Sequence, residues 1–438
     1  MYRSEPDKTD RLPGGIPHII GNEAAERFSF YGMKAILAVF LTQYMLDGQG
    51  RPDRLTEDKA TEWVHLFNTA VYLTPIAGAV LADRFFGKYK TILVLSIVYC
   101  LGHFALALDE TRNGIFLGLL LISIGAGGIK PCVSAHVGDQ FGEHNRHHLP
   151  KVFSWFYFSI NLGAFTSMLL TPYILKEHGA AWAFGIPGAL MVLATCVFWA
   201  GRTRFIHIPP AGKKFIKDSF NKNSFKAVSK LCIIYLFVAP FWAIFDQTGS
   251  KWIFQAQKMD RDIFGWEVLP SQMQSLNPIL VLTLIPVFTY VLYPVLNRFF
   301  ELTPLKKIAI GLFLTTGAYA IPFWIEAQIQ AGVKPTILWQ ALAYFLLTAA
   351  ELMISITCLE FSYTQAPKSM KSIIMGLFFA SVALGNLFTA LVTKLGGADL
   401  SGVAYYRFFT ICIAVTAVLF LFVVKFYKPE AVSIKEDS

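Results

Sequence analysis

Apolar residues fill this chain in long blocks separated by short polar segments. Each block has about the 20 residues that a helix needs to cross a bilayer, and the expected spans are 18–44, 60–82, 90–108, 112–137, 150–176, 182–200, 229–256, 271–297, 305–325, 335–362, 371–394 and 403–427. Six spans precede a basic segment and six follow it. We therefore expect an all-α polytopic membrane protein with an N-terminal six-helix bundle at 1–200, a basic cytoplasmic linker at 201–228 and a C-terminal six-helix bundle at 229–438.

Composition and loop charge agree with this architecture. Of the 438 residues, 55% are hydrophobic and 15% charged, which is too apolar for a soluble globular protein. The expected loops and tails on the side of the termini hold 24 Lys and Arg residues and those on the other side hold 10, so the positive-inside rule places both termini in the cytoplasm. We see no cleaved signal peptide at the start.

The basic and sulfur-containing residues indicate no other class of function. The net charge of +9 is spread over short loops, which argues against a nucleic-acid partner. The six cysteines lie within expected spans at no metal-ligand spacing, so they predict neither a disulfide framework nor a metal or redox site.

The first span carries a charged stripe. In GNEAAERFSFYGMK (21–34), one helical face holds Glu23, Glu26, Arg27, Tyr31 and Lys34. Such a stripe must face a water-filled cavity, because charge facing lipid is costly. One carboxylate can pair with Arg27, while the other is left partly desolvated and so favours proton uptake. Lys130, alone in the apolar fourth span, is the candidate cation that approaches it. A static salt-bridge cluster that fixes helix packing is the alternative.

The short loop GAVLADRFFGKYK (78–90) resembles the loop between the second and third helices of the major facilitator superfamily. The resemblance implies that Asp83 and Arg84 help close the cytoplasmic side. For Lys88 and Lys90 an ordinary positive-inside loop is the favoured interpretation.

Within that superfamily, five motifs resemble the proton-dependent oligopeptide transporter (POT) family: EAAERFSFYG (23–32), GGIKP (127–131), FYFSINLGAF (156–165), FDQTGSKW (245–252) and AELMISITCLEFSYTQAP (350–367). They look closest to animal-type members, without the large extracellular domain, for which this chain has no room. The resemblance implies the twelve-helix superfamily fold and proton-coupled symport of di- and tripeptides into the cell by alternating access. The membrane would be the plasma membrane, or the inner membrane in a bacterium.

The resemblance also implies roles for individual residues. Proton coupling falls to Glu23, Glu26, Arg27 and Lys130, and to His65, which aligns with a histidine of the animal-type members. Lys34 would bind the peptide carboxylate, with snorkelling to the surface as its alternative.

Polar groups elsewhere complete the expected peptide site. Glu351, a lone carboxylate in the tenth span, would bind the peptide amino group, and Asp246 lies at a depth that allows a gating salt bridge to Lys34. The remaining expected binding residues are Tyr31, Tyr72, Asn161, Trp252 and Phe378. Asn161 could instead serve helix packing and Trp252 could face lipid, while Phe378 stands where the family usually has Trp.

The sequence leaves two alternatives to peptide transport open. The fold could carry nitrate or a drug, or the chain could bind peptide without moving it. A hydrolase is not expected, since neither H-E-x-x-H nor G-x-S-x-G occurs. The expected partners are di- and tripeptides, peptide-like drugs, protons as coupling ion without any other cofactor, and the lipid bilayer, with the chain acting as a monomer.

Overall fold

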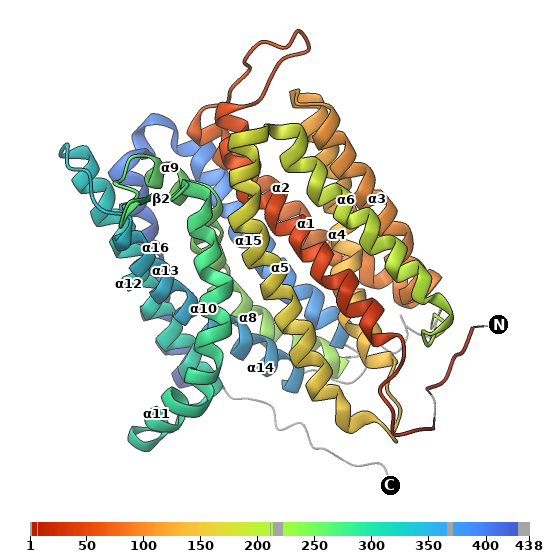
Figure 1. Cartoon of the computed structure of the whole chain (residues 1–438). Helices are drawn as coiled ribbons and strands as arrows, with labels where there is room; N and C mark the ends of the chain where they lie inside the picture. The colour runs from red at the N-terminus through yellow and green to blue at the C-terminus, as the bar shows by residue number, and fades with distance from the viewer. Residues whose placement is uncertain (1, 7, 211, 213–221, 366–370, 428–438) are drawn as a thin grey trace.

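The computed structural model describes residues 2–6, 8–210, 212, 222–365 and 371–427. Residues 211 and 213–221 of the predicted basic linker lie outside the described residues. The described chain is almost entirely helical (Figure 1).

Six long helices form the N-terminal half: α1 (Ile16–Gln43), α2 (Glu57–Val80), α3 (Lys88–Leu108), α4 (Arg112–Asp139), α5 (Leu149–His178) and α6 (Ala180–Ala200). A π-helical turn (Leu81–Phe86) extends α2, and 3-10 turns precede α5 (Arg146–His148) and follow α6 (Gly201–Thr203). Thr56 and Thr111 begin α2 and α4 by accepting a backbone N–H with their hydroxyl oxygens, which satisfies donors that a helix start leaves unpaired.

The spans of the C-terminal half are more interrupted. The seventh span comprises α8 (Lys222–Phe245), a 3-10 turn (Asp246–Gly249) and α9 (Lys251–Gln257), and the eighth comprises a 3-10 turn (Pro270–Ser275), α10 (Leu276–Val287), a π-helical turn (Phe288–Leu292) and α11 (Tyr293–Phe299). The ninth span is α12 (Pro304–Gln330), and the tenth comprises α13 (Leu338–Glu351), a π-helical turn (Leu352–Ile356) and α14 (Thr357–Gln365). The eleventh is α15 (Lys371–Gly396), and a 3-10 turn (Gly397–Leu400) connects it to the twelfth, α16 (Gly402–Phe426). Strands β1 (Asp262–Ile263) and β2 (Trp266–Glu267) form a short antiparallel hairpin before the eighth span.

Every span expected from the sequence coincides with a helix or an interrupted helix. In the part of the chain that the structure describes, 11 segments are long and apolar enough to cross a membrane. The twelfth is α1, whose 28 residues include the charged stripe. An even number of crossings brings the start of α1 and the end of α16 to the same side, here called inner, with the opposite side called outer.

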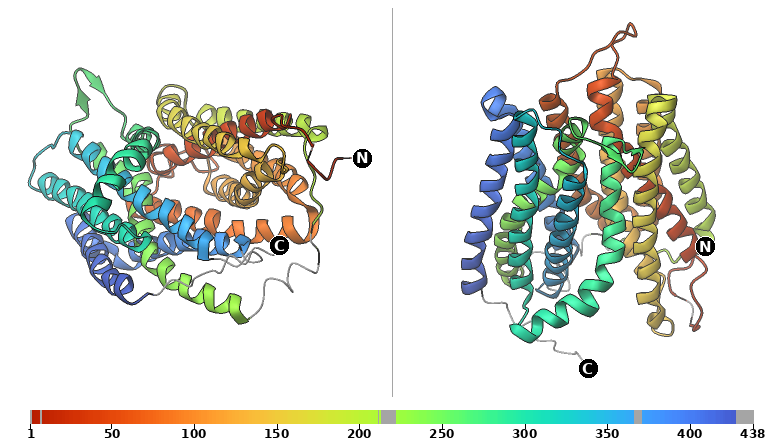
Figure 2. Two further views of the ribbon diagram at one scale, coloured as in Figure 1. Left: turned by 90° about the horizontal axis from the view of Figure 1, so that it is seen from below. Right: turned by 60° about the vertical axis from the view of Figure 1, so that its left-hand side comes forward.

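Two main apolar cores hold the molecule together, one built mostly by α1 to α6 and one by the spans from α8 to α16. The halves lie side by side, with α2 packed along α15 and α5 against α10 (Figure 2). Glycines allow the closest approach within the first half, because a Cβ on Gly78 would overlap the Cα of Gly128. In the glycine-rich stretch 123–131, Gly127 packs against Thr74 of α2 and Gly128 against Leu95 of α3, so the stretch allows both helices to approach α4 closely.

Candidate functional site

A cavity of about 150 Å³ lies between the two halves. Its walls carry both signs of charge and several aromatic rings. The first half contributes Tyr31, Lys34, Tyr72 and Met168, and the second half contributes Trp242, Phe245, Asp246, Thr248, Gln274, Asn277, Tyr344, Leu347, Thr348 and Glu351. This central cavity thus brings together five residues that the sequence assigned to peptide binding or gating.

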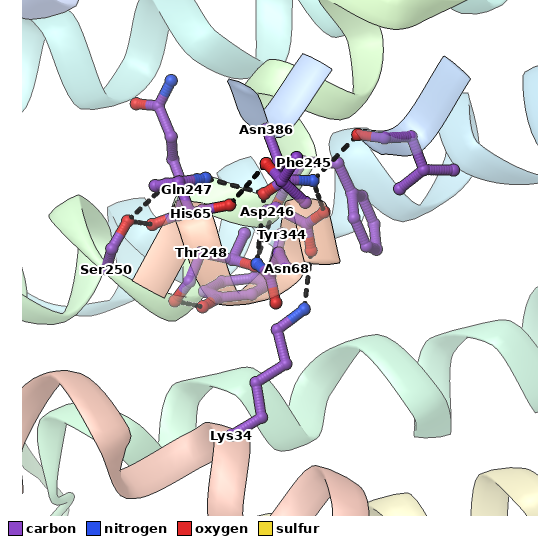
Figure 3. Close-up of polar contacts among 12 residues, drawn as sticks. Lys34, His65, Asn68, Phe245, Asp246, Gln247, Thr248, Ser250, Tyr344 and Asn386 are labelled. Atoms are coloured by element: carbon purple, nitrogen blue, oxygen red, sulfur yellow. Dashed lines mark hydrogen bonds and ion pairs between the residues drawn. The ribbon is translucent and has the colours of Figure 1, made fainter. Parts of the chain in front are cut away.

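Lys34 and Asp246 close the outer end of the central cavity. Lys34 Nζ lies 2.7 Å from Asp246 Oδ1, and the two residues are only 7% and 3% exposed. The other carboxylate oxygen, Oδ2, accepts a hydrogen bond of 2.7 Å from Asn386 Nδ2. Figure 3 shows Lys34 rising from α1 to this cluster. The 3-10 turn between α8 and α9 places Asp246 there.

Asn386 connects this ion pair to His65. Its side-chain oxygen lies 2.7 Å from His65 Nδ1 and accepts a second hydrogen bond of 3.1 Å from Asn68 Nδ2. His65 Nε2 lies 3.0 Å from Ser250 Oγ (Figure 3). The histidine therefore sits where α2, α15 and the break in the seventh span meet. Asn386 and Ser250 were missed, although an Asn in an apolar span is a signal for such a contact.

Further ion pairs join the halves at the outer end. Lys251 pairs with Asp58, and Lys258 Nζ lies 3.3 Å from Glu57 Oε2. Gln274 adds a hydrogen bond of 3.2 Å from its Nε2 to the backbone oxygen of residue 35. The outer side is closed by these contacts.

The charged stripe of α1 lies inside the first half. Arg27 Nε is 2.7 Å from Glu23 Oε1 and 3.3 Å from Glu26 Oε2. Glu26 is fully buried, and among the described residues neither of its carboxyl oxygens has a hydrogen-bond donor. A buried charge in this situation is costly, whereas a protonated carboxyl is tolerated far better. The arrangement suits a group that binds a proton.

Lys130 lies between this cluster and the central cavity. Its Nζ stands 3.9 Å from the ring centre of Phe30 and 4.7 Å from that of Tyr72. Cation–π contact of this kind stabilises a buried ammonium. Since Tyr72 also lines the cavity, Lys130 contacts a wall of the space that a substrate would occupy.

Glu351 lies on the opposite wall, where α13 passes into its π-helical turn. Its Oε2 accepts a hydrogen bond of 2.7 Å from Asn277 Nδ2, which also donates to Thr348 Oγ1 at 3.2 Å. Asn277 was not anticipated from the sequence. No cation pairs with Glu351 in the described part of the chain, so it faces the cavity as an acceptor for an incoming donor.

Three of the expected binding residues lie away from the central cavity lining. Asn161 Nδ2 donates to the backbone oxygen of residue 157 at 2.9 Å, which is a contact within α5. Trp252 is fully buried and packs edge-on against Tyr344 with ring centres 5.0 Å apart. It therefore neither lines the cavity nor faces lipid. Phe378 packs behind Trp242, with ring centres 6.2 Å apart, and it is Trp242 that reaches the cavity.

The expected inner gate is described only in part. Asp83 and Arg84 lie in the π-helical turn that ends α2, and the Arg84 guanidinium stands 5.0 Å from the Phe85 ring centre. Lys88, interpreted from the sequence as an ordinary loop charge, pairs with Asp139 at 2.7 Å and so joins the start of α3 to the end of α4.

A family model described as "POT family" matches residues 89–225 and 219–399. Peptide transporter family 1 of Drosophila melanogaster is 36% identical over 372 residues, covering 74% of this chain and 49% of that protein. Solute carrier family 15 member 2 of Mus musculus is 36% identical over 373 residues, covering 74% and 50%. The chain spans about half the length of these curated relatives.

Solved structures with a similar fold cover nearly the whole chain. A crystal structure of the POT family transporter PepTSo has a TM-score of 0.88 at 36% identity and covers 95% of this chain and 98% of that one. A POT peptide transporter in complex with alafosfalin has a TM-score of 0.80 at 26% identity, with 96% of both chains covered. The predictions of family and fold are thereby confirmed. The chain is a multi-pass membrane protein of the major facilitator type, and it belongs to the POT family, which is a family of transporters rather than of enzymes.

Proposed function

We propose that the chain is a proton-coupled symporter that carries di- and tripeptides, and peptide-like drugs, into the cell across the plasma membrane. The bundles at 1–200 and 229–438 would rock about the central cavity, so that it opens to each side in turn. The observation that carries this proposal is the cavity itself, because it holds a cation from one half and a carboxylate from the other.

The charges on the cavity walls suit the two ends of a peptide. Lys34 would bind the peptide carboxylate and Glu351 the amino group, each by charge-assisted hydrogen bonds. Tyr31, Tyr72 and the aromatic wall around Trp242 would contact the backbone and side chains.

Peptide binding would also act on the outer gate. Lys34 is held by Asp246 at 2.7 Å, so a peptide carboxylate competes with Asp246 for the same ammonium. Exchange of one carboxylate for the other would release Asp246 to its remaining partners, Asn386 and, through it, His65. The surroundings of His65 would therefore differ between the paired and unpaired states of Lys34 and Asp246. Asp83 and Arg84 would help close the inner side.

The proton would be carried by the cluster on α1. Glu26 is the proposed proton acceptor, with Glu23 holding Arg27 in place. Movement of Lys130 from the rings of Phe30 and Tyr72 towards Glu26 would favour release of the proton. Because Tyr72 lines the cavity, substrate contact and the position of Lys130 are coupled.

Uptake of a labelled dipeptide into proteoliposomes tests the proposal. Wild-type protein should show both counterflow and proton-driven accumulation. Glu26→Gln should lose proton-driven uptake and retain exchange, whereas Glu177→Gln, on an exposed residue outside the site, should behave as wild type. Uptake indifferent to a proton gradient would reject the coupling, and absence of dipeptide exchange would reject the substrate.

The carboxylate contact has its own test. Lys34→Ala should raise the half-saturating concentration at least tenfold for a free dipeptide, since a hydrogen bond to a charged group contributes about 1.5–3 kcal/mol. The C-terminally amidated dipeptide should be affected much less. Equal effects on both would reject the assignment of Lys34 to the carboxylate.

A further inference from the structure

The β1–β2 hairpin between the seventh and eighth spans exposes two large aromatic side chains. Phe264 is 97% exposed and Trp266 is 81% exposed. In the part of the chain that the structure describes, no other large apolar side chain is as exposed as Phe264. Neither residue lines the central cavity, so the proposed peptide site does not account for them.

The turn at the tip of this hairpin holds Phe264 in an unfavourable backbone conformation. Ile263 pairs with Trp266 across the hairpin, which leaves Phe264 and Gly265 as a two-residue turn. Both have a positive φ, 53° and 86°, as a type I′ turn requires. Glycine and asparagine adopt this conformation readily, whereas a bulky side chain in it costs energy. Backbone strain of this kind is found most often where the residue serves a function.

The base of the hairpin is firmly attached to the second half. The backbone N–H of Asp260 donates to the oxygen of Pro335 at 2.9 Å, and its backbone oxygen accepts a hydrogen bond of 2.7 Å from Ile337. The two arms are joined by an ion pair, in which Arg261 Nη2 lies 2.6 Å from Glu267 Oε1. The aromatic tip is therefore held away from the protein by a fixed base.

The charged groups of the hairpin are confined to this base. The four residues from 263 to 266 carry no charge. Asp262, which precedes them, accepts a hydrogen bond of 2.8 Å from the backbone N–H of Gly265 on its Oδ1 and so stabilises the turn. Glu267, which follows them, is paired with Arg261. The hairpin thus has an apolar tip and a polar base.

The hairpin points towards the space that lipid occupies around the protein. It projects sideways beyond the helices of the second half (Figure 2). In Figure 1 it lies no further out than the outer end of α12. It connects two segments that are each long and apolar enough to cross the membrane. The medium beside the end of a span is the headgroup region of the bilayer, where Trp side chains are enriched.

We propose that this hairpin is a membrane anchor, with Phe264 and Trp266 inserted into the headgroup region of the outer leaflet. The indole of Trp266 suits that depth, because its ring is apolar and its N–H can donate to water or to lipid oxygens. Residues 260–267 hold three acids and one arginine. Burial of apolar surface, and not attraction to anionic lipid, therefore supplies the binding.

Nitroxide accessibility in the full chain tests where the tip lies. Labels at Phe264→Cys and, as an aqueous control, at Gln49→Cys in the exposed loop before α2 are placed on a cysteine-free background in phosphatidylcholine bilayers. At position 264, collisions with oxygen, which concentrates in the bilayer, should exceed those with a water-soluble nickel chelate. At position 49 the order should be reversed.

Three results of this measurement would overturn the proposal. A label at position 264 that collides with the nickel chelate as often as the label at 49 would place the tip in water. Protection from both reagents would mean that protein, such as a second copy of the chain, covers the tip. An oxygen preference that appears only after anionic phosphatidylglycerol is added would reject the apolar basis of the contact.

A second measurement tests the contribution of the strained residue. Quenching of Trp266 by brominated phosphatidylcholine is taken as the part of the total quenching that Trp266→Tyr removes. Phe264→Asn should lower this part by about half or more, because the two rings supply similar apolar areas. Leu108→Asn, at an exposed apolar residue at the end of α3, is the matched control and should leave it unchanged.

Thermal stability separates an anchor from a residue that the fold requires. Phe264→Asn should keep or raise the thermal midpoint, since asparagine adopts the turn conformation more readily than phenylalanine. A lower midpoint together with unchanged quenching of Trp266 would mean that Phe264 stabilises the fold, and it would overturn the proposal. These measurements need no transport, so they remain decisive even if the chain moves no peptide.

Discussion

Breaking the pair between Lys34 and Asp246 should open the outer side. In Asp246→Asn the ammonium of Lys34 remains buried, at 7% exposure, but loses the carboxylate that lies 2.7 Å away. Removing one partner of a buried ion pair costs about 3–5 kcal/mol. When the outer side opens, water reaches Lys34 and removes that cost. The ratio of outer-closed to outer-open protein should therefore fall by up to about two to three and a half orders of magnitude.

Spin-label distances across the outer seam measure this shift. Gln49, in the loop before α2, and Phe264, in the β1–β2 hairpin, are both exposed and belong to different halves. With labels at these positions on a cysteine-free background, the wild type should give one short distance. Asp246→Asn should give a longer one. Asp399→Asn, at an exposed acid on the same side, is the matched control.

The double variant decides whether the unpaired charge is the cause. Lys34→Met with Asp246→Asn removes both charges, and it should return much of the population to the short distance. The reasoning is refuted if Asp246→Asn keeps the wild-type distance. It is also refuted if the double variant is as open as the single one, because the buried ammonium would then not drive opening.

Three further changes probe other parts of the molecule. Gly128→Val should overfill the α3–α4 contact, where a Cβ would overlap the Leu95 side chain, and destabilise the protein by about 1–3 kcal/mol, seen as a lower thermal midpoint, while Gly138→Ala, with open space around it, should not. Glu351→Gln should raise the half-saturating concentration of a free dipeptide in counterflow more than that of its N-acetylated form, and equal effects would exclude an amino-group contact. The Arg112 guanidinium lowers the pKa of the exposed Asp53 carboxyl by hydrogen bonding. The Asp53–Arg112 pair therefore stabilises the folded protein above the pKa that Asp53 has in the unfolded chain, and this stabilisation is lost as the pH falls through the lower pKa of Asp53 in the folded protein. The thermal midpoints of wild type and Arg112→Ala should therefore converge in acid.

The positions of the spans could be predicted from the sequence because they depend on local properties. A run of about 20 apolar residues has no alternative to a helix in lipid, where every backbone group must be satisfied within the segment. The same holds for the charged stripe of α1, because helical periodicity alone puts Glu23, Glu26 and Arg27 within reach of one another. The interruption of the seventh span at Asp246–Gly249 was not expected, although it is what presents Asp246 to Lys34.

The side-chain environments were predicted less completely. Trp252 was expected at a pocket or in lipid, but it is enclosed by Tyr344 and its neighbours within the second half. Its place at the cavity is taken by Trp242, ten residues earlier. Hydrophobicity cannot separate these outcomes, because a buried, a lipid-facing and a cavity-lining Trp look alike in an apolar span.

The sequence by itself determined the membrane class, the number and limits of the spans, and the family, since these follow from local composition and motifs. Only the tertiary structure decided which charges meet. Lys34 and Asp246 are 212 residues apart, and His65 and Asn386 are 321 apart. Such contacts depend on how whole helices pack and rotate against one another, which no local pattern specifies.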